Sequence, residues 1–287
     1  MDPRPVVEAA GLTRRYGSFV AVDHVSFRVG AGRTVGLIGP NGAGKSTILH
    51  ALMGLAPSEG RIRVLGREPF RERAALMRDV AFVPDVAVLP GWMRVGRAID
   101  LAAALYPRFR RDRVLAFLER CRIPASHRVR TLSKGLKAQL HLAIATAVDA
   151  RLLVLDEPTL GLDFLARRAF YDALAAEQSQ SSRAILITTH QVDEVEPLLS
   201  DLLFVDRGRL VLDCAVDALG ARFAALEAAP EHLIEARGLK PFHERRLADR
   251  VELYFEGADP ATLARFGAVR TPGVADLFIA RLGGSAP

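Results

Sequence analysis

The segment Gly39–Thr47 reads Gly-Pro-Asn-Gly-Ala-Gly-Lys-Ser-Thr and constrains the fold more than any other stretch of the chain. An apolar run, Val35–Ile38, precedes it, and a helix-forming run, Ile48–Met53, follows it. A buried strand that enters a glycine-rich turn and continues as a helix directs backbone N–H groups at one point, where the helix dipole adds about half a positive charge. The sequence therefore predicts an α/β fold that binds a nucleoside triphosphate.

Different residues of this loop are expected to bind the phosphates and the metal ion. Lys45 is expected to reach the terminal phosphates, and the hydroxyl of Ser46 is expected to hold Mg²⁺. The other nucleotide-binding candidates of the loop are Gly39, Asn41, Gly42, Ala43, Gly44 and Thr47.

Composition excludes several classes of protein. Half of the 287 residues are hydrophobic, which is ample for one large domain or two modest ones. The net charge of +6 comes almost entirely from arginines scattered along the chain, without a long basic run, so we expect no nucleic-acid partner. Cys121 and Cys214 lie far apart and have no metal or redox spacing, which indicates reduced thiols.

No segment predicts secretion or a membrane crossing. The N-terminal residues Met1–Pro5 lack the apolar core of a signal peptide. The best apolar stretch, Leu140–Val148, has about half the length that a membrane-spanning helix needs. We therefore expect a cytoplasmic protein that is soluble by itself.

Strands and helices are predicted to alternate over most of the chain. Residues 5–38 alternate apolar and polar side chains and should be rich in strands, whereas residues 74–150 should be mainly helical. Short apolar runs separated by helical segments predict a parallel sheet covered on both faces. Strands are expected at 35–38, Arg61–Leu65, Leu152–Leu155, Ala184–Ile187 and Leu202–Val205.

The pattern of predicted strands and helices changes from about Gly220, so we divide the chain into residues 1–219 and an accessory α+β unit, 220–287. In the accessory unit, Glu231–Ala236 and Arg250–Phe255 are predicted to be strands. Asp259 is predicted to cap a short helix, and 274–282 should form the last helix.

An apolar strand ends in two adjacent carboxylates, Asp156 and Glu157. Parallel sheets bind ligands at the carboxyl ends of their strands, so both acids can face the phosphates. We assign Asp156 to Mg²⁺, through its waters, and Glu157 to the polarisation of the attacking water. His190 follows another predicted strand and can reach the same edge, although a lone histidine in such a place more often has a structural role.

The segment Thr131–Leu136 reads Thr-Leu-Ser-Lys-Gly-Leu and resembles the Leu-Ser-Gly-Gly-Gln signature of the ATP-binding cassette family, the ATPase subunits of ABC transporters. The resemblance covers residues 5–215 and includes the phosphate loop and the carboxylate strand. It implies a parallel-sheet core, an antiparallel β subdomain, a helical subdomain at about 86–148 and a small C-terminal α+β extension. An unrelated P-loop kinase or GTPase would not explain the signature at this spacing.

The family assigns further roles by position. Ser133 and Gly135 would bind the γ-phosphate of ATP held on a partner subunit, and Asp163 would lie in the loop that crosses this interface. Tyr16 would stack on adenine; the alternative is that it is a core tyrosine beside a turn. His190 would contact the γ-phosphate.

The resemblance also implies the partners. It implies ATP and Mg²⁺, a second ATPase subunit in a homodimer or heterodimer, and a separate transmembrane permease that holds the protein on the inner face of the cell membrane. The permease is expected to dock around 86–106, where Leu89, Trp92 and Met93 either form this surface or pack the helical subdomain. The competing hypothesis is a soluble ABC ATPase that acts on nucleic acid or the ribosome.

Two residues depart from the family pattern. Asp85 stands where most members have a glutamine, and we expect it to contact the metal with altered strength. Its charge would be neutralised near Mg²⁺ but would repel a γ-phosphate. Lys134 replaces the first signature glycine and would either lie beside the partner's γ-phosphate or point to solvent. The Leu-Ser-Lys-Gly form and the segment 274–278 are similar to a bacterial subgroup that works with ABC-2-type permeases and includes exporters of drugs and peptides.

Overall fold

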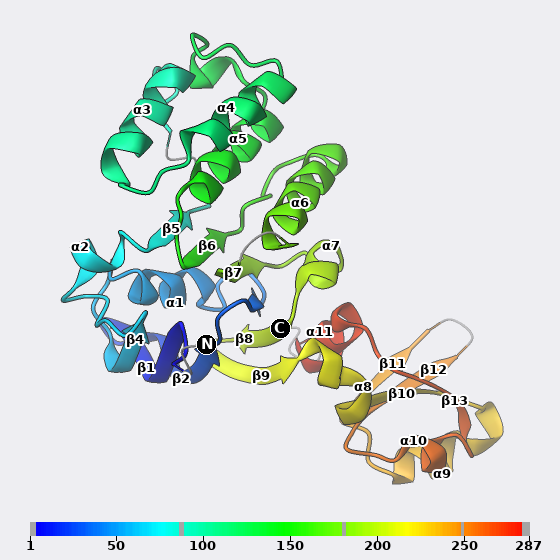
Figure 1. Ribbon diagram of the computed structural model, residues 1–287. Helices are drawn as coiled ribbons and strands as arrows, with labels where there is room; N and C mark the ends of the chain where they lie inside the picture. The colour runs from blue at the N-terminus through cyan, green and yellow to red at the C-terminus, as the bar shows by residue number, and fades with distance from the viewer. Residues whose placement is uncertain (1–3, 86–88, 180–181, 248–249, 283–287) are drawn as a thin grey trace.

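The computed structural model describes residues 4–85, 89–179, 182–247 and 250–282. A six-stranded sheet with the order β5-β6-β7-β3-β8-β9 forms its centre (Figure 1). The first five of these strands run parallel, and β9 runs antiparallel to β8. In sheet order the strands are β5 (Val80–Val83), β6 (Leu152–Asp156), β7 (Ala184–Thr189), β3 (Thr34–Ile38), β8 (Asp201–Asp206) and β9 (Arg209–Ala215).

Both faces of this sheet are buried, because successive side chains of its apolar strands point to opposite sides. Along β6, Val154 belongs to the core on one face and Leu153 to the core on the other. The first face is covered by α1 (Lys45–Leu52), and the second by α5, α6, α7 and α11. These four are α5 (Lys134–Ala147), α6 (Phe164–Ser179), α7 (Val192–Val195) and α11 (Val274–Leu282). The prediction of a parallel sheet covered on both faces is confirmed.

The strand-rich N-terminal segment forms a three-stranded antiparallel sheet with the order β2-β1-β4. Its strands are β1 (Val7–Tyr16), β2 (Phe19–Val29) and β4 (Glu59–Val64). Gly17, at φ 59°, allows the tight turn between Tyr16 and Phe19, which pair across the hairpin. Alternate apolar residues of this sheet join α1 in one core.

Residues 95–147 contribute a helical group, which stands at the top of Figure 1 around its own core of Val95, Ile99, Val114 and Leu140. It contains α3 (Val95–Leu105), α4 (Arg111–Arg120), the 3₁₀ turn η1 (Val129–Thr131) and α5. The expectation of a mainly helical region holds here, but it missed β5. Four residues are too few to show a strand period after the short helix α2 (Arg73–Leu76), and pairing with β6 decides their conformation.

The C-terminal part contains a four-stranded antiparallel sheet with the order β11-β12-β10-β13. Its strands are β11 (His243–Arg246), β12 (Val251–Glu256), β10 (Phe223–Ala228) and β13 (Gly267–Arg270), preceded by η3 (Val216–Ala218) and α8 (Leu219–Arg222). The strand predicted at Arg250–Phe255 is confirmed as β12. The short helix after Asp259 is also confirmed, because its carboxylate accepts hydrogen bonds from the N–H groups of Ala261 and Thr262 in α10 (Pro260–Leu263).

The strand predicted at Glu231–Ala236 is wrong. These residues belong to a 3₁₀ turn, η4 (Pro230–His232), and to α9 (Leu233–Gly238). Pro230 suits a helical start, and the three-residue spacing of Leu233 and Ala236 places both against the sheet core.

Helix α11 packs on both sheets. Val274 and Leu277 are buried in the core of the six-stranded sheet, whereas Ala280 packs with Tyr254 of β12. The guanidinium of Arg281 lies 4.3 Å from the ring centre of Phe242, which is also part of this contact. None of the helices in the described part of the chain has the length and apolar character that a membrane crossing requires.

Candidate functional site

The glycines of the loop between β3 and α1 are required by the backbone and by close neighbours. Gly42 and Gly44 have φ values of 80° and 102°, a region that other residues rarely adopt. A Cβ atom on Gly44 would lie 2.7 Å from the carbonyl oxygen of Ala21, and one on Gly39 would lie 2.3 Å from that of Val205. The loop therefore keeps its shape only with glycine at these positions. Around them, Asn41 is exposed, Ala43 is buried and Thr47 is half-buried.

Lys45 begins α1 and turns its ammonium group into the loop. Nζ donates to the carbonyl oxygens of Gly39, at 2.8 Å, and Pro40, at 3.2 Å. It also lies 3.2 Å from Oε1 of Glu157, and Lys45 is only 6% exposed. A buried cation at the start of a helix, where backbone N–H groups lack partners within the helix, suits a phosphate, so these residues fit the triphosphate that the motif predicts.

Asp156 and Ser46 meet beside this loop. The Ser46 hydroxyl lies 3.3 Å from Oδ1 of Asp156, which is 1% exposed at the end of β6. A hydroxyl and a carboxylate are the hard oxygen donors that Mg²⁺ prefers. No group of three or more His, Cys, Asp or Glu side chains suited to a metal occurs among the described residues. Mg²⁺ needs only one or two protein oxygens when water and phosphates complete its shell, and Ser46 and Asp156 would supply them.

Glu157 connects Lys45 with His190. Its Oε1 lies near Lys45, and its Oε2 lies 2.9 Å from Nδ1 of His190. The two come together because Asp156 pairs with Thr188 across the parallel strands β6 and β7, so the residues that follow emerge at one edge of the sheet. Glu157 has a φ of 43°, uncommon for a residue with a side chain.

Thr188 also belongs to this cluster, and the sequence prediction missed it. Its hydroxyl lies 2.6 Å from Oδ1 of Asp156 and 2.8 Å from the backbone N of Glu157. The available signal was a polar residue at the end of an otherwise apolar run, two residues before the predicted His190.

Asp85 and Tyr16 lie outside this network of contacts, as far as the described residues show. Asp85 is exposed just beyond β5, and the pairing of Val83 with Leu155 places it at the same sheet edge as Asp156. Tyr16 is 48% exposed at the end of β1, with the guanidinium of Arg14 4.5 Å from its ring centre.

Ser133, Gly135 and Asp163 form a second group. Ser133 is the N-cap of α5, and its hydroxyl accepts a hydrogen bond from the N–H of Leu136 at 3.2 Å. A Cβ atom on Gly135 would lie 2.7 Å from Cβ of Ala166, whose N–H donates to Oδ1 of Asp163 at 2.8 Å. The starts of α5 and α6 thus lie together, with Ser133, Lys134 and Asp163 exposed.

Large apolar side chains surround Asp163 at the surface. Leu160 is 57% exposed, Phe164 62% and Leu165 76%. Three such side chains so close in sequence favour a protein interface at this place.

Comparison with known proteins identifies the family of the chain. The family described as ABC transporter matches residues 22–160. The Nod factor export ATP-binding protein I of Cupriavidus pinatubonensis is 34% identical over 272 residues, which cover 90% of this chain and 82% of the relative. The chain belongs to the ABC transporter family. It is an ATP-binding subunit, and it shares the ATP-hydrolysing activity of that family.

Two solved structures have a similar fold. An ATP-binding subunit of an ABC transporter aligns with a TM-score of 0.68 and 27% identity, over 75% of this chain and 92% of that one. The dimeric structure of a bacterial ABC transporter cassette aligns with a TM-score of 0.65 over 73% of this chain and 98% of that one, and at 21% identity it shows the fold alone.

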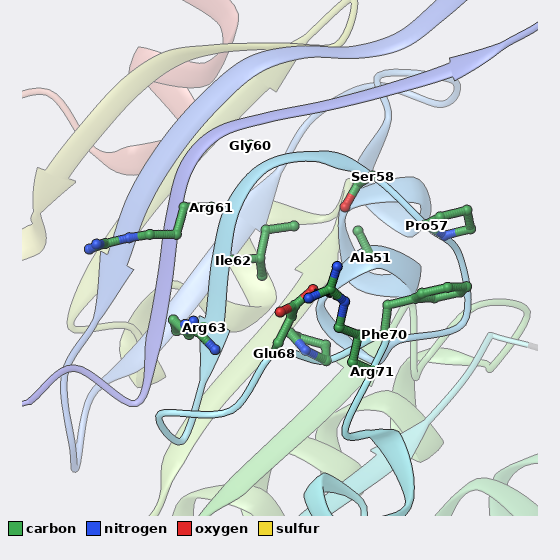
Figure 2. A pocket seen from close by; sticks show the side chains of 11 residues that line it. Ala51, Pro57, Ser58, Gly60, Arg61, Ile62, Arg63, Glu68, Phe70 and Arg71 are labelled. Carbon is green, nitrogen blue, oxygen red and sulfur yellow. Dashed lines mark ion pairs between the residues drawn. The ribbon is translucent and has the colours of Figure 1, made fainter.

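Two pockets lie away from the phosphate loop. A small one of about 120 Å³ lies between β5 and α5, with Leu89, Tyr106 and Ile144 in its apolar wall. A larger one of about 600 Å³ lies beside β4, where Arg71 pairs with Glu68 at 3.2 Å (Figure 2). The larger pocket contains none of the predicted site residues.

Proposed function

We propose that this ABC subunit powers export through a separate membrane permease, with Mg²⁺·ATP bound between two subunits. The observation that carries the proposal is the cluster of Lys45, Glu157 and His190 at the phosphate loop, joined by contacts of 2.9 and 3.2 Å. The name of the exporter relative supports the direction of transport.

The loop holds the nucleotide. Backbone N–H groups of the loop that ends at Thr47 would hold the phosphates, Lys45 would neutralise their charge, and the exposed ring of Tyr16 would stack on adenine. Ser46 and Asp156 hold Mg²⁺, which supplies charge neutralisation when bound. Asp85 adds a carboxylate at the same sheet edge.

Glu157 acts as the general base. Its carboxylate lies at the edge of the phosphate loop, and Nδ1 of His190 holds Oε2 in place. A base within hydrogen-bond reach of the attacking water contributes about 10²–10⁴-fold to the rate. His190, at the same edge of the sheet, would contact the terminal phosphate, as its position in the family pattern implies.

The second group of residues completes the site of another subunit. Ser133, Gly135 and Asp163 lie together at the surface, and the first turn of α5 offers N–H groups and the positive end of a helix dipole. Exposed Phe164 and Leu165 extend the interface. Two chains in head-to-tail orientation, identical or homologous, would therefore enclose two ATP molecules. Lys134 is exposed next to this surface.

The permease docks beside the apolar pocket between β5 and α5. Leu89 and Tyr106 line this pocket, and Trp92 is 70% exposed nearby in sequence. A cytoplasmic segment of the permease is the expected occupant, and it would hold the protein at the inner face of the cell membrane. Residues 86–88 of the predicted docking surface lie outside the described residues.

The proposed domain division stays at 1–219 and 220–287, with the helical subdomain at about 86–148. Helix α11 belongs by sequence to the second part but packs Leu277 into the core of the first. The accessory sheet is therefore fixed to the ATPase domain by its own last helix.

The decisive experiment uses Glu157→Gln, which keeps the shape of the side chain but removes the base. With ATP and Mg²⁺ we expect this variant to form a stable dimer in size-exclusion chromatography and to lose at least about 10²-fold in hydrolysis rate. Glu59→Gln, on exposed β4, is the matched control and should behave as wild type.

Membrane partnership is tested separately. Affinity purification of the tagged Glu157→Gln protein from ATP-treated membranes should recover a polytopic membrane protein. A trapped dimer that recovers nucleic acid or ribosomes in its place would contradict the transport role.

A further inference from the structure

Thr188 is a polar residue in a buried strand whose preceding residues are apolar. It is fully buried in β7, between the strands β6 and β3, and residues 184–187 before it are all apolar and buried. An unpaired buried hydroxyl costs about 1–3 kcal/mol. Here both of its hydrogen-bond functions are used, one by the carboxylate of Asp156 and one by the backbone of Glu157.

The direction of these two bonds is fixed by chemistry. The backbone N–H of Glu157 can only donate, so Oγ1 of Thr188 accepts this bond. The single hydroxyl proton is then directed at Oδ1 of Asp156, which as a carboxylate can only accept. The two hydrogen bonds therefore form a series from the N–H of Glu157 through the O–H of Thr188 to the carboxylate of Asp156, and each bond polarises the next.

Each bond fixes one feature of the site. The proton from Thr188 sets the rotation of the Asp156 carboxyl group, whose Oδ1 also meets the hydroxyl of Ser46 at 3.3 Å. The N–H of Glu157 donates to Oγ1 of Thr188 at 2.8 Å and to its carbonyl oxygen at 3.2 Å, so the hydroxyl accepts the shorter of two bonds that help to hold a backbone with a φ of 43°. That backbone in turn aims the Glu157 side chain at Lys45 and His190.

We propose that Thr188 is a positioning residue for ATP hydrolysis, which orients Asp156 toward the metal and Glu157 toward the water through one hydroxyl group. This inference rests on the metal and base roles proposed above for Asp156 and Glu157. Partners of this kind, behind a metal ligand, typically contribute about 10–100-fold to metal affinity or activity.

The test compares Thr188→Val with Thr188→Ser. Valine keeps the branched shape that suits a buried strand but removes the hydroxyl, whereas serine keeps the hydroxyl. Thr189→Val is the matched control, because the neighbouring Thr189 is equally buried but its hydroxyl accepts a hydrogen bond from the N–H of Gln191, away from the carboxylates.

Three readouts are needed: the kcat and KM for ATP, the Mg²⁺ concentration at half-maximal rate, and equilibrium binding of a fluorescent ATP analogue with Mg²⁺ or with EDTA. For Thr188→Val we expect a kcat about 10–100-fold lower and a raised Mg²⁺ requirement. Analogue binding should weaken with Mg²⁺ and stay unchanged in EDTA. Thr188→Ser should recover most of the rate, and Thr189→Val should resemble wild type.

The inference is overturned if Thr188→Val keeps its kcat within about twofold of wild type, or if binding weakens equally with Mg²⁺ and with EDTA. A folded Thr188→Ser protein with the same deficit as the valine variant would also overturn it, because only packing would then explain the loss. The variant Asp156→Asn tests the proposed metal role of Asp156 separately from the positioning role of Thr188. If that variant keeps a normal Mg²⁺ requirement, the proposed metal role itself fails.

Discussion

Replacing Leu277 with alanine tests whether the last helix stabilises the ATPase core. Leu277 is 0% exposed and packs with residues of the six-stranded sheet, although α11 lies in the C-terminal part of the sequence. The change removes three carbon atoms, which at about 0.8 kcal/mol each corresponds to about 2.4 kcal/mol of lost burial. The cavity adds to this, and buried Leu→Ala changes in a known core cost about 2.7–5.0 kcal/mol. We expect a loss of about 3 kcal/mol.

Differential scanning calorimetry measures this loss. A change of about 3 kcal/mol in a chain of this size lowers Tm by about 6–12 °C. Added Mg²⁺·ATP raises the transition of the part that binds it and so identifies that transition. We expect the nucleotide-sensitive transition to fall in Leu277→Ala.

The matched control is Ile279→Ala on the same helix, where the side chain is 42% exposed. It should change stability by less than about 1 kcal/mol. The reasoning fails if the two variants lose the same stability, or if Leu277→Ala shifts only a transition that does not respond to nucleotide.

Three further predictions concern the phosphate loop, the second group and the accessory sheet. Gly44→Ala should lower ATP-analogue affinity by at least about tenfold, because its Cβ would meet the carbonyl of Ala21 at 2.7 Å; wild-type affinity would contradict this. Asp163→Ala should cost about 1 kcal/mol in chemical denaturation, because the cap on Ala166 N–H is lost. The pKa of Glu244 is lowered to about 2 by two neighbouring arginines, so its contribution to stability is present above pH 4.5 and is lost as the pH falls toward 2. Glu244→Gln should therefore be less stable than wild type at pH 6, by less than about 1 kcal/mol because the pair is partly exposed, and the difference should vanish near pH 2.

Features that depend on residues close in sequence could be predicted from the sequence. The strand, loop and helix around Lys45 follow from local spacing, and the structure places them as β3, the loop and α1. The meeting of Glu157 with His190 followed from one rule of topology, that parallel strands end at the same edge of a sheet.

Features decided by partners distant in sequence could not be predicted. The strand β5 has four residues and owes its conformation to β6, about 70 residues later. Segment 231–236 forms a helix because the sheet beneath it offers an apolar face, which the local pattern does not reveal. The role proposed for Thr188 depends on strand register, since its pairing with Asp156 brings a buried hydroxyl to the Asp156 carboxylate and to the backbone N–H of Glu157.

The contacts of Glu157 connect the phosphate loop with His190, the two parts of the proposed site. Lys45 has two anionic neighbours available to it, the Glu157 carboxylate at 3.2 Å and the phosphates that its loop is built to hold. A buried cation that moves to a phosphate weakens its hold on Oε1 of Glu157, while Oε2 keeps its contact with Nδ1 of His190 and the backbone N–H keeps its bond to Oγ1 of Thr188. If Glu157 is the base proposed above, phosphate in the loop would therefore free one oxygen of the carboxylate and leave the other one held.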